Sequence, residues 1–185
     1  MSKGHLFVIS GTSGVGKSTI LEQLMKNRSD LLFSVSATTR KPRPQEREGI
    51  SYYFVTREQF REMISRDAFV EYDNHMENYY GTPKAQLEEK LTRGNVILDI
   101  EPKGALQVRA SRPDATLIFI APPSMEELER RLRGRGDTSE EQIQVRLARA
   151  KWELDQQDKY DYRVINEDVA TCVKEILNII AQKAD

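Results

Sequence analysis

A glycine-rich turn between an apolar run and a helical pattern places the tightest limit on the fold of this chain. The segment Gly11–Ser18 reads GTSGVGKS and fits the spacing GxxxxGK[ST]. The apolar run Phe7–Ile9 before it is a candidate for a buried strand, and Ser18–Lys26 after it has apolar residues at helical spacing. This order of strand, turn and helix predicts a phosphate-binding loop, and hence a chain that handles a nucleoside triphosphate.

The chemistry of the loop follows from its residue types. Its glycines let the backbone bring amide donors close to phosphate oxygens, and the following helix favours negative charge at its N-terminus. Lys17 is expected to reach the β- and γ-phosphates, and the Ser18 hydroxyl to ligate Mg²⁺. The predicted nucleotide contacts here are Gly11, Thr12, Ser13, Gly14, Val15, Gly16, Lys17, Ser18 and Thr19. The loop alone fits a GTPase as well as an ATPase, and a glycine turn with a surface lysine is the simplest alternative.

Length, charge and cysteine content exclude several classes of protein. With 185 residues, of which 31% are charged, the chain suits one compact domain. A formal net charge of −1 gives no global basic field, so neither nucleic acid nor an acidic membrane is an expected partner. Cys172 is the only cysteine, which excludes an internal disulfide and a cysteine-rich metal site. The chain has no secretory leader pattern and no stretch of about 18 apolar residues, so we expect a cytoplasmic protein; self-association is left open.

Four short apolar runs alternate with helical patterns along the chain. They cover Phe7–Ser10, Val96–Asp99, Thr116–Ala121 and Arg163–Asn166. This alternation predicts an α/β core, a parallel sheet covered by helices.

Three helix starts carry recognisable signals. The segments Ser124–Glu127 and Thr138–Glu141 fit the capping box, and Thr82-Pro83 places proline at a first helical position. The helix after the second capping box is expected to face the core through Ile143, Leu147, Ala150 and Leu154.

Residues 34–81 differ from this pattern. Aromatic, alternating segments at Ser51–Val55 and Phe69–Tyr72 surround one short helical pattern at Thr56–Ile64, which predicts an inserted, mixed antiparallel subdomain. Glycines flank Arg135 in the segment Gly134–Thr138, as in a loop that closes over a ligand. We therefore expect one domain with a core of residues 1–33 and 82–185, an insertion of residues 34–81 and a small helical lid within residues 131–149.

The strand-like segment Ser34–Thr39 is followed by two arginines separated by a proline turn, Arg40 and Arg43. Arginine side chains suit bidentate contact with phosphate, and Tyr52 and Tyr80 offer hydroxyls for the remaining oxygens. These residues predict a site for a second phosphate. A solvated basic turn is the alternative, which the phosphate loop disfavours.

Taken together, these segments resemble guanylate kinases. The resemblance rests on GTSGVGKST, SVSATTRKPR, GISYYFV, FVEY, NYYGTP, ILDIE, IFIAPPS, RRLRGRG and INED, which run nearly from one end of the chain to the other. It implies transfer of a phosphoryl group from ATP to GMP, giving ADP and GDP in purine nucleotide metabolism and GMP recycling, with Mg²⁺ as cofactor. It also implies a phosphate-loop core, a GMP-binding insertion and an arginine-bearing lid.

The resemblance assigns the acceptor residues. It places Arg40, Arg43, Tyr52 and Tyr80 on the GMP phosphate, and Ser36, Glu71 and Thr82 around the guanine. A carboxylate at Glu71 accepts from both N1–H and the exocyclic amine of guanine, whereas adenine has a lone pair at N1 and no amine beside it. AMP should therefore be rejected. Without the resemblance, Glu71 fits a solvated strand carboxylate at least as well.

Asp99 ends the apolar run Val96–Leu98, where strands of a parallel sheet deliver side chains to the ligand crevice. It either holds Mg²⁺ through water or touches the acceptor nucleotide. Glu101 stands where the family often has aspartate, and Pro102-Lys103 departs from the pair usual before the glycine. Glu101, Pro102 and Lys103 are left without a role.

For the lid, the resemblance marks Arg131, Arg135 and Arg146. With Lys17, Arg40 and Mg²⁺, they are expected to neutralise the charge of the phosphoryl group as it moves. Asn166 matches the family segment near the adenine of ATP, either in direct contact or as part of a backbone-organising turn. His5 and His75 are expected at ordinary surface positions.

Two other functions are weighed against this one. Relatives of the fold serve as catalytically inactive protein-interaction domains, but these usually lack the phosphate loop, which is complete here. Kinases of sugar phosphates share the core, and the guanine-directed set Ser36, Glu71 and Thr82 argues against them.

Overall fold

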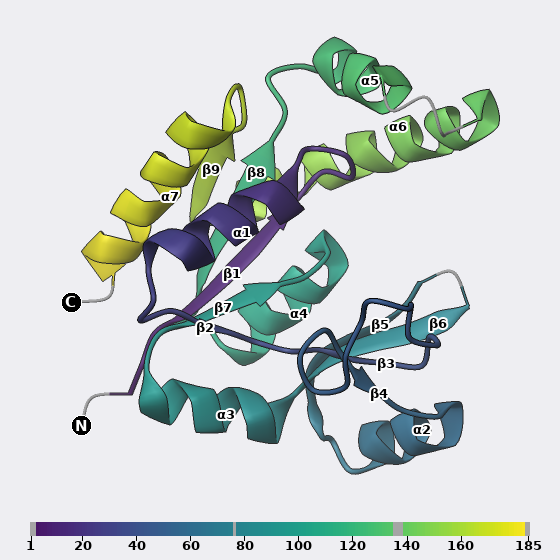
Figure 1. Ribbon diagram of the computed structural model, residues 1–185, viewed down its shortest axis with the longest axis vertical. Helices are drawn as coiled ribbons and strands as arrows, with labels where there is room; N and C mark the ends of the chain where they lie inside the picture. The colour runs from purple at the N-terminus through teal and green to yellow at the C-terminus, as the bar shows by residue number, and fades with distance from the viewer. Residues whose placement is uncertain (1–2, 76, 135–138, 184–185) are drawn as a thin grey trace.

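The computed structural model describes residues 3–75, 77–134 and 139–183, and the strands in that part of the chain form two sheets. The strands of the first sheet are β1 (Leu6–Gly11), β2 (Leu32–Phe33), β7 (Val96–Asp99), β8 (Thr116–Ala121) and β9 (Tyr162–Ile165). They are parallel throughout, in the order β2-β7-β1-β8-β9 (Figure 1). The predicted α/β core and its four predicted strands are confirmed, whereas β2 is too short to leave a pattern.

Helices cover both faces of this sheet. They are α1 (Lys17–Asn27), α3 (Lys84–Arg93), α4 (Pro102–Ser111) and α7 (Val169–Lys183). Phe7 and Ile9 of β1 belong to the core shared with α1 and α7, whereas Leu6 and Val8 belong to the core shared with α3 and α4. Because successive strand residues point to opposite faces, a strand buried on both sides has the continuous apolar run seen here.

The second sheet lies beside the first, at one end of the molecule (Figure 1). Its region comprises β3 (Ala37–Thr38), β4 (Tyr53–Phe54), α2 (Arg57–Ser65), β5 (Phe69–His75) and β6 (Asn78–Pro83). The strand order is β4-β3-β6-β5, with β3 and β4 parallel and the other pairs antiparallel. The predicted mixed character is therefore confirmed.

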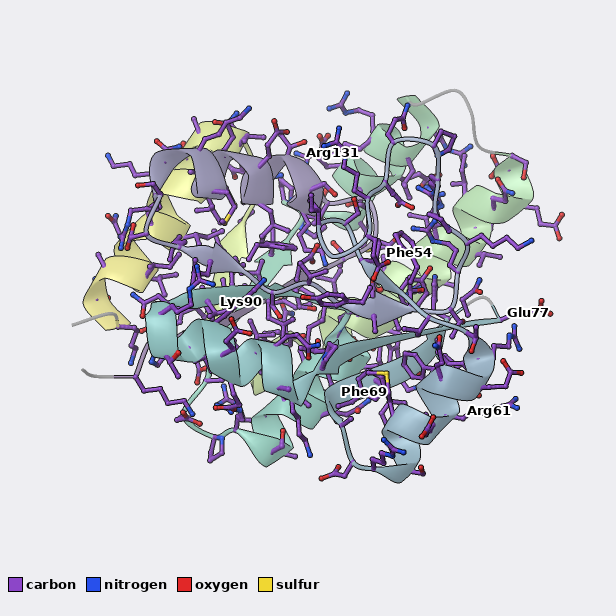
Figure 2. All side chains as sticks on the ribbon, turned by 60° about the horizontal axis from the view of Figure 1, so that its bottom comes forward. Phe54, Arg61, Phe69, Glu77, Lys90 and Arg131 are labelled. Carbon is purple, nitrogen blue, oxygen red and sulfur yellow. The ribbon has the colours of Figure 1, made fainter. Side chains whose placement is uncertain are left out.

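A small aromatic core holds α2 against this sheet. The ring of Phe60 stacks on Phe69 with 4.4 Å between centroids and on Tyr79 with 5.1 Å. The Thr56 hydroxyl caps the helix by accepting the backbone N–H of Gln59, and the Gln59 side chain accepts the backbone N–H of Thr56. In Figure 2, Arg61 lies on the outer side of α2 and Phe69 on its inner side. The packing supports β5 and β6, which carry the predicted acceptor residues Glu71, Tyr80 and Thr82.

Two further helices, α5 (Met125–Gly134) and α6 (Glu140–Asp155), pack on each other through Leu128, Leu132 and Ala150. A 3-10 turn at Gln157–Lys159 links α6 to β9. Residues 135–138, with the predicted Arg135 and the loop around it, lie outside the described residues. No helix in the described part of the chain is both long and apolar enough to cross a bilayer.

The caps of these two helices differ from each other in how well the sequence predicted them. Ser124 accepts the N–H of Glu127 at 3.1 Å, as predicted. The prediction of Thr138 as the cap of α6 is wrong, because the helix begins at Glu140 and Ser139 accepts the N–H of Gln142 at 3.3 Å. Adjacent threonine and serine both suit a cap, and only the helix start distinguishes them.

Pro83 ends a strand and does not begin a helix, which corrects a second prediction. Its backbone is extended, with ψ 128°. The next N–H, of Lys84, donates to the carbonyl of Ala68 at 2.8 Å across the sheet. Pairing of β6 with β5 therefore continues through Pro83, and α3 starts at Lys84.

Candidate active site

The phosphate loop joins β1 to α1 in the conformation that its glycines require. Gly14 and Gly16 have φ of 86° and 94°, a region that side chains disfavour. A Cβ at Gly11 would lie 2.6 Å from the carbonyl oxygen of Ile120 on β8. Gly16 is the N-cap residue of α1, and among the described residues no side chain accepts the first N–H groups of the helix. These amides therefore stay available to an anion. The loop residues from Gly11 to Thr19 line a cavity of about 260 Å³.

Lys17 extends from this loop toward β7 and forms an ion pair with Asp99. Burial alone would lower the pKa of Lys17, but the carboxylates of Asp99, Glu101 and Glu153 raise it above its usual value. The lysine therefore stays charged. Asp99 is partly exposed, with 29% of its side chain accessible, and it also lines a second cavity.

The second cavity, of about 270 Å³, lies between the two sheets. The predicted residues that line it are Lys17, Ser36, Tyr52, Glu71, Tyr80 and Asp99. They come from segments that are far apart in the chain. Lys17 borders both cavities, so the two predicted nucleotide sites adjoin each other at this residue.

Glu71 is a buried carboxylate in the wall of this cavity, with 5% of the residue accessible. The hydroxyl of Thr82, in the neighbouring strand, donates to its Oε1 at 2.6 Å. Burial raises the pKa of Glu71 to about 7, although the hydrogen bonds from Thr82 oppose the rise. The structure thus brings Glu71 and Thr82 together as predicted, and it excludes a solvated strand position for Glu71.

Gly104 is a residue of this site that the sequence analysis missed. It lies in the first turn of α4, where a Cβ would come within 2.5 Å of the Glu71 carboxylate. Only glycine leaves room for the buried acid. An isolated glycine inside a helical segment signals such a close approach.

The two arginines of the basic turn meet at a glutamate. Arg40 forms a bidentate pair with Glu46, at 2.7 and 3.0 Å, and its guanidinium lies 5.4 Å from the centre of the Tyr52 ring. The backbone N–H of Arg43 donates to the same carboxylate at 2.8 Å. Arg40 therefore lies beside the cavity, whereas the Arg43 side chain is exposed and does not line it. Glu46 occupies the arginine fork in the way that a phosphate does.

Arg131 and Asn166 lie at the other side of the phosphate loop. With Gly14, Val15 and Gly16 they line a third cavity of about 260 Å³ (Figure 2 labels Arg131). The Asn166 amide donates to the carbonyl of Val15 at 2.8 Å, and its Oδ1 is buried without a hydrogen-bond partner in the described part of the chain. Arg131 donates to the Asn166 carbonyl at 3.0 Å.

The apolar stripe predicted for α6 is only partly correct. Ile143 and Ala150 are buried, but Leu147 and Leu154 are half-buried, and the fully buried side chain near the end of the helix is Glu153. Arg146 is half-buried and has no ion-pair partner among the described residues. Glu153 of this helix faces the phosphate loop, where it accepts the backbone N–H of Ser13 at 2.7 Å.

Neither histidine has an ordinary surface position, which corrects that prediction. His5 is half-buried and shares a hydrogen bond of 2.7 Å with the Thr116 hydroxyl. His75 lines the second cavity, and Arg149 of α6 donates to it at 3.1 Å. Both contacts join segments more than 70 residues apart, so residue order gives no sign of them.

The segment after β7 gains a structural explanation. Pro102 occupies the first turn of α4, where its missing N–H costs nothing, and Lys103 forms an ion pair with Asp73 of β5. Lys103 thus adds no uncompensated charge to the cavity. Glu101, just before the helix, borders both the phosphate-loop cavity and the second cavity.

Known proteins resemble this chain over nearly its whole length. The family model for guanylate kinase matches residues 3–183. The guanylate kinase of Clostridium acetobutylicum is 50% identical over 179 residues, which cover 96% of this chain and 85% of that protein. The guanylate kinase of Prochlorococcus marinus is 47% identical over 183 residues, which cover 98% of each chain. The crystal structure of guanylate kinase from Anaplasma phagocytophilum superposes with a TM-score of 0.79 at 33% identity, covering 100% of this chain and 88% of that chain. The chain belongs to the guanylate kinase family.

Proposed function

We propose that this chain transfers the γ-phosphoryl group of ATP to GMP. The observation that carries the proposal is the buried Glu71–Thr82 pair in a cavity that Lys17 of the phosphate loop also lines. A carboxylate accepts from two donors at once, and guanine offers two adjacent donors at N1 and the exocyclic amine. The family membership supports a nucleoside monophosphate kinase, and this carboxylate selects guanine.

In this proposal GMP occupies the second cavity. Its base lies against Glu71, Thr82 and Ser36, and its phosphate lies toward Tyr52 and Tyr80. Arg40, which is already beside Tyr52, exchanges Glu46 for the phosphate, and Arg43 joins it from the same turn. Residues 34–81 then form the GMP-binding part of the domain, and residues 131–149 form its lid.

ATP occupies the phosphate loop from Gly11 to Thr19, with its base toward Asn166. Lys17 lies between the two cavities and stabilises the phosphoryl group in transit, helped by Arg131, Arg135 and Arg146 from the lid. No general base is required, because the second pKa of a phosphate monoester is about 6 and the acceptor is mostly dianionic at neutral pH.

The oxygen donors at the loop suit Mg²⁺. The Ser18 hydroxyl is exposed at the start of α1, and Asp99 offers a partly exposed carboxylate at the end of β7. Among the described residues no group of three or more His, Cys, Asp or Glu side chains is arranged to hold a metal. This fits an ion that takes hard oxygen ligands and is completed by nucleotide phosphates and water. When bound, Mg²⁺ neutralises charge on the β- and γ-phosphates.

An inactive interaction domain is not favoured, because the phosphate loop is complete and borders an open cavity. A sugar-phosphate kinase is disfavoured by the guanine-directed set Ser36, Glu71 and Thr82, of which Glu71 and Thr82 are already hydrogen-bonded to each other.

A coupled assay of ADP release tests the proposal. Purified protein with ATP and Mg²⁺ should form ADP in proportion to added GMP and should use AMP far less well. Absence of GMP-dependent ADP, or equal use of AMP, would show that the acceptor is wrong. Calorimetric titration with ATP separates an inactive binding domain from an enzyme with a different acceptor.

A further inference from the structure

A single guanidinium on α6 contacts three other charged or polar groups. Arg149 donates to Glu153 on its own helix at 2.8 Å, to Glu101 before α4 at 2.8 Å, and to His75 of β5 at 3.1 Å. These partners belong to the lid helix, the core and the second sheet. Arg149 therefore makes contacts with all three parts of the molecule.

Glu153 extends this network to the phosphate loop. Its Oε1 accepts from Arg149, and its Oε2 accepts the backbone N–H of Ser13 at 2.7 Å. No part of the Glu153 side chain is accessible to solvent. A buried carboxylate without a cation is strongly unfavourable, so the ion pair with Arg149 favours the ionised form of Glu153 at this position. Burial raises the pKa of Glu153, and the contacts with Ser13 and Arg149 oppose the rise.

Glu101 differs from Glu153 in being exposed, so what it needs is not compensation for burial but neutralisation toward the bound phosphates. It borders both the phosphate-loop cavity and the second cavity, where the proposed reaction brings two phosphate chains. A carboxylate at this junction repels phosphate unless a cation neutralises it. Lys17 is paired with Asp99 and is also attracted by Glu101, but the cation in direct contact with Glu101 among the described residues is Arg149.

We propose that Arg149 is a positioning residue for phosphoryl transfer, which fastens α6 to Glu101 and His75 and so holds Glu153 on the Ser13 amide of the phosphate loop. The inference rests on the proposed transfer from ATP to GMP. Arg149 acts through Glu153 and Glu101 and does not itself contact the reacting atoms.

The test compares Arg149→Gln with Lys151→Gln, an exposed residue of the same helix that loses the same charge. We expect Arg149→Gln to lower kcat with GMP about tenfold, which corresponds to the loss of one such interaction in the transition state, while Lys151→Gln keeps the parent rate. Arg149→Lys keeps the charge but loses the fork geometry, so it should recover part of kcat. Thermal melting of each variant checks that the fold persists at the assay temperature.

Two readouts separate positioning from a general structural role. Hydrogen exchange at the Ser13 amide should be faster in Arg149→Gln than in Lys151→Gln, because Glu153 no longer holds that N–H. A double-mutant cycle on kcat tests the coupling between Glu101 and Arg149. In the Arg149→Gln background Glu101 has already lost its cation, so Glu101→Gln should lower kcat less there than it does in the parent protein.

Each failure has a distinct meaning. If the parent protein forms GMP-dependent ADP but Arg149→Gln matches Lys151→Gln in kcat and in Ser13 exchange, the inference is overturned and the proposed function stands. Additive losses in the double-mutant cycle also overturn it. If the parent protein forms no GMP-dependent ADP, the proposed function fails, while the exchange measurement still decides whether Arg149 holds the loop.

Discussion

The donor and acceptor sides of the site are built in different ways. The donor side is one contiguous loop, Gly11–Thr19, that offers backbone amides from positions set by Gly14 and Gly16. The acceptor side collects single side chains from separate segments, such as Ser36, Glu71 and Tyr80. Backbone amides recognise phosphate, which all nucleoside triphosphates share, whereas we propose that the buried Glu71 recognises one base. The general function is therefore local in the chain, and the specific function depends on tertiary packing.

The largest effect should come from the residue shared by both sides. We expect Lys17→Ala to lower kcat about a thousandfold, because the charge of the moving phosphoryl group loses its central cation. Asp99 is partly exposed and can be solvated, so the melting temperature should change little. Lys26→Ala, on the exposed side of the same helix, is the matched control. A Lys17→Ala enzyme with a near-normal rate would contradict the assignment of the loop.

On the acceptor side, Glu71→Gln should affect one nucleotide only. An amide has one acceptor and places a donor against guanine, so we expect kcat/KM for GMP to fall about a hundredfold. The KM for ATP should stay within about twofold. Steady-state kinetics with each nucleotide varied in turn checks this. Equal losses for both nucleotides would mean that Glu71 supports the fold and does not read the base.

Gly104→Ala tests whether the acceptor side depends on tertiary packing. The added Cβ would lie 2.5 Å from the Glu71 carboxylate and must displace it. We expect kcat/KM for GMP to fall about thirtyfold while calorimetric ATP affinity is retained. Gly94→Ala is the control, because a Cβ there would lie 3.4 Å from the Asp30 carbonyl oxygen and 4.0 Å from Leu32, which are ordinary contacts. Equal GMP kinetics in the two variants would remove Gly104 from the site.

The dependence on pH should also distinguish the two sides. The pKa of Glu71 is raised to about 7, and only the ionised acid accepts both guanine donors. Therefore kcat/KM for GMP should rise with pH through 7, and below pH 6, where the acceptor phosphate is also protonated, it should fall by up to about a hundredfold per unit. Glu71→Gln should lose this limb and retain only that of the acceptor phosphate, near pH 6. An unchanged profile in the variant would assign the titration to another group.

Much of the fold could be read from local patterns. The strand Val96–Asp99 and the strand Thr116–Ala121 have the predicted bounds, because buried parallel strands are continuous apolar runs. The cap at Thr56 also forms within four residues of chain. The predictions of a helix cap at Thr138 and of a helix start at Pro83 are wrong because local signals were not sufficient there. In each case the local signal allows two neighbouring positions, and pairing or helix packing selects one.

The sequence by itself determined the phosphate loop, the parallel core and the residue types of the acceptor side, because each is encoded by neighbouring residues and by backbone preferences. The tertiary structure alone decided that Glu71 is buried, that Gly104 makes room for it, and that Arg149 joins Glu101 to Glu153. These properties arise from desolvation and from contacts between segments far apart in the chain. Neither desolvation nor a contact between distant segments leaves a local sequence pattern, because the energy of a buried charge depends on the groups that surround it in space.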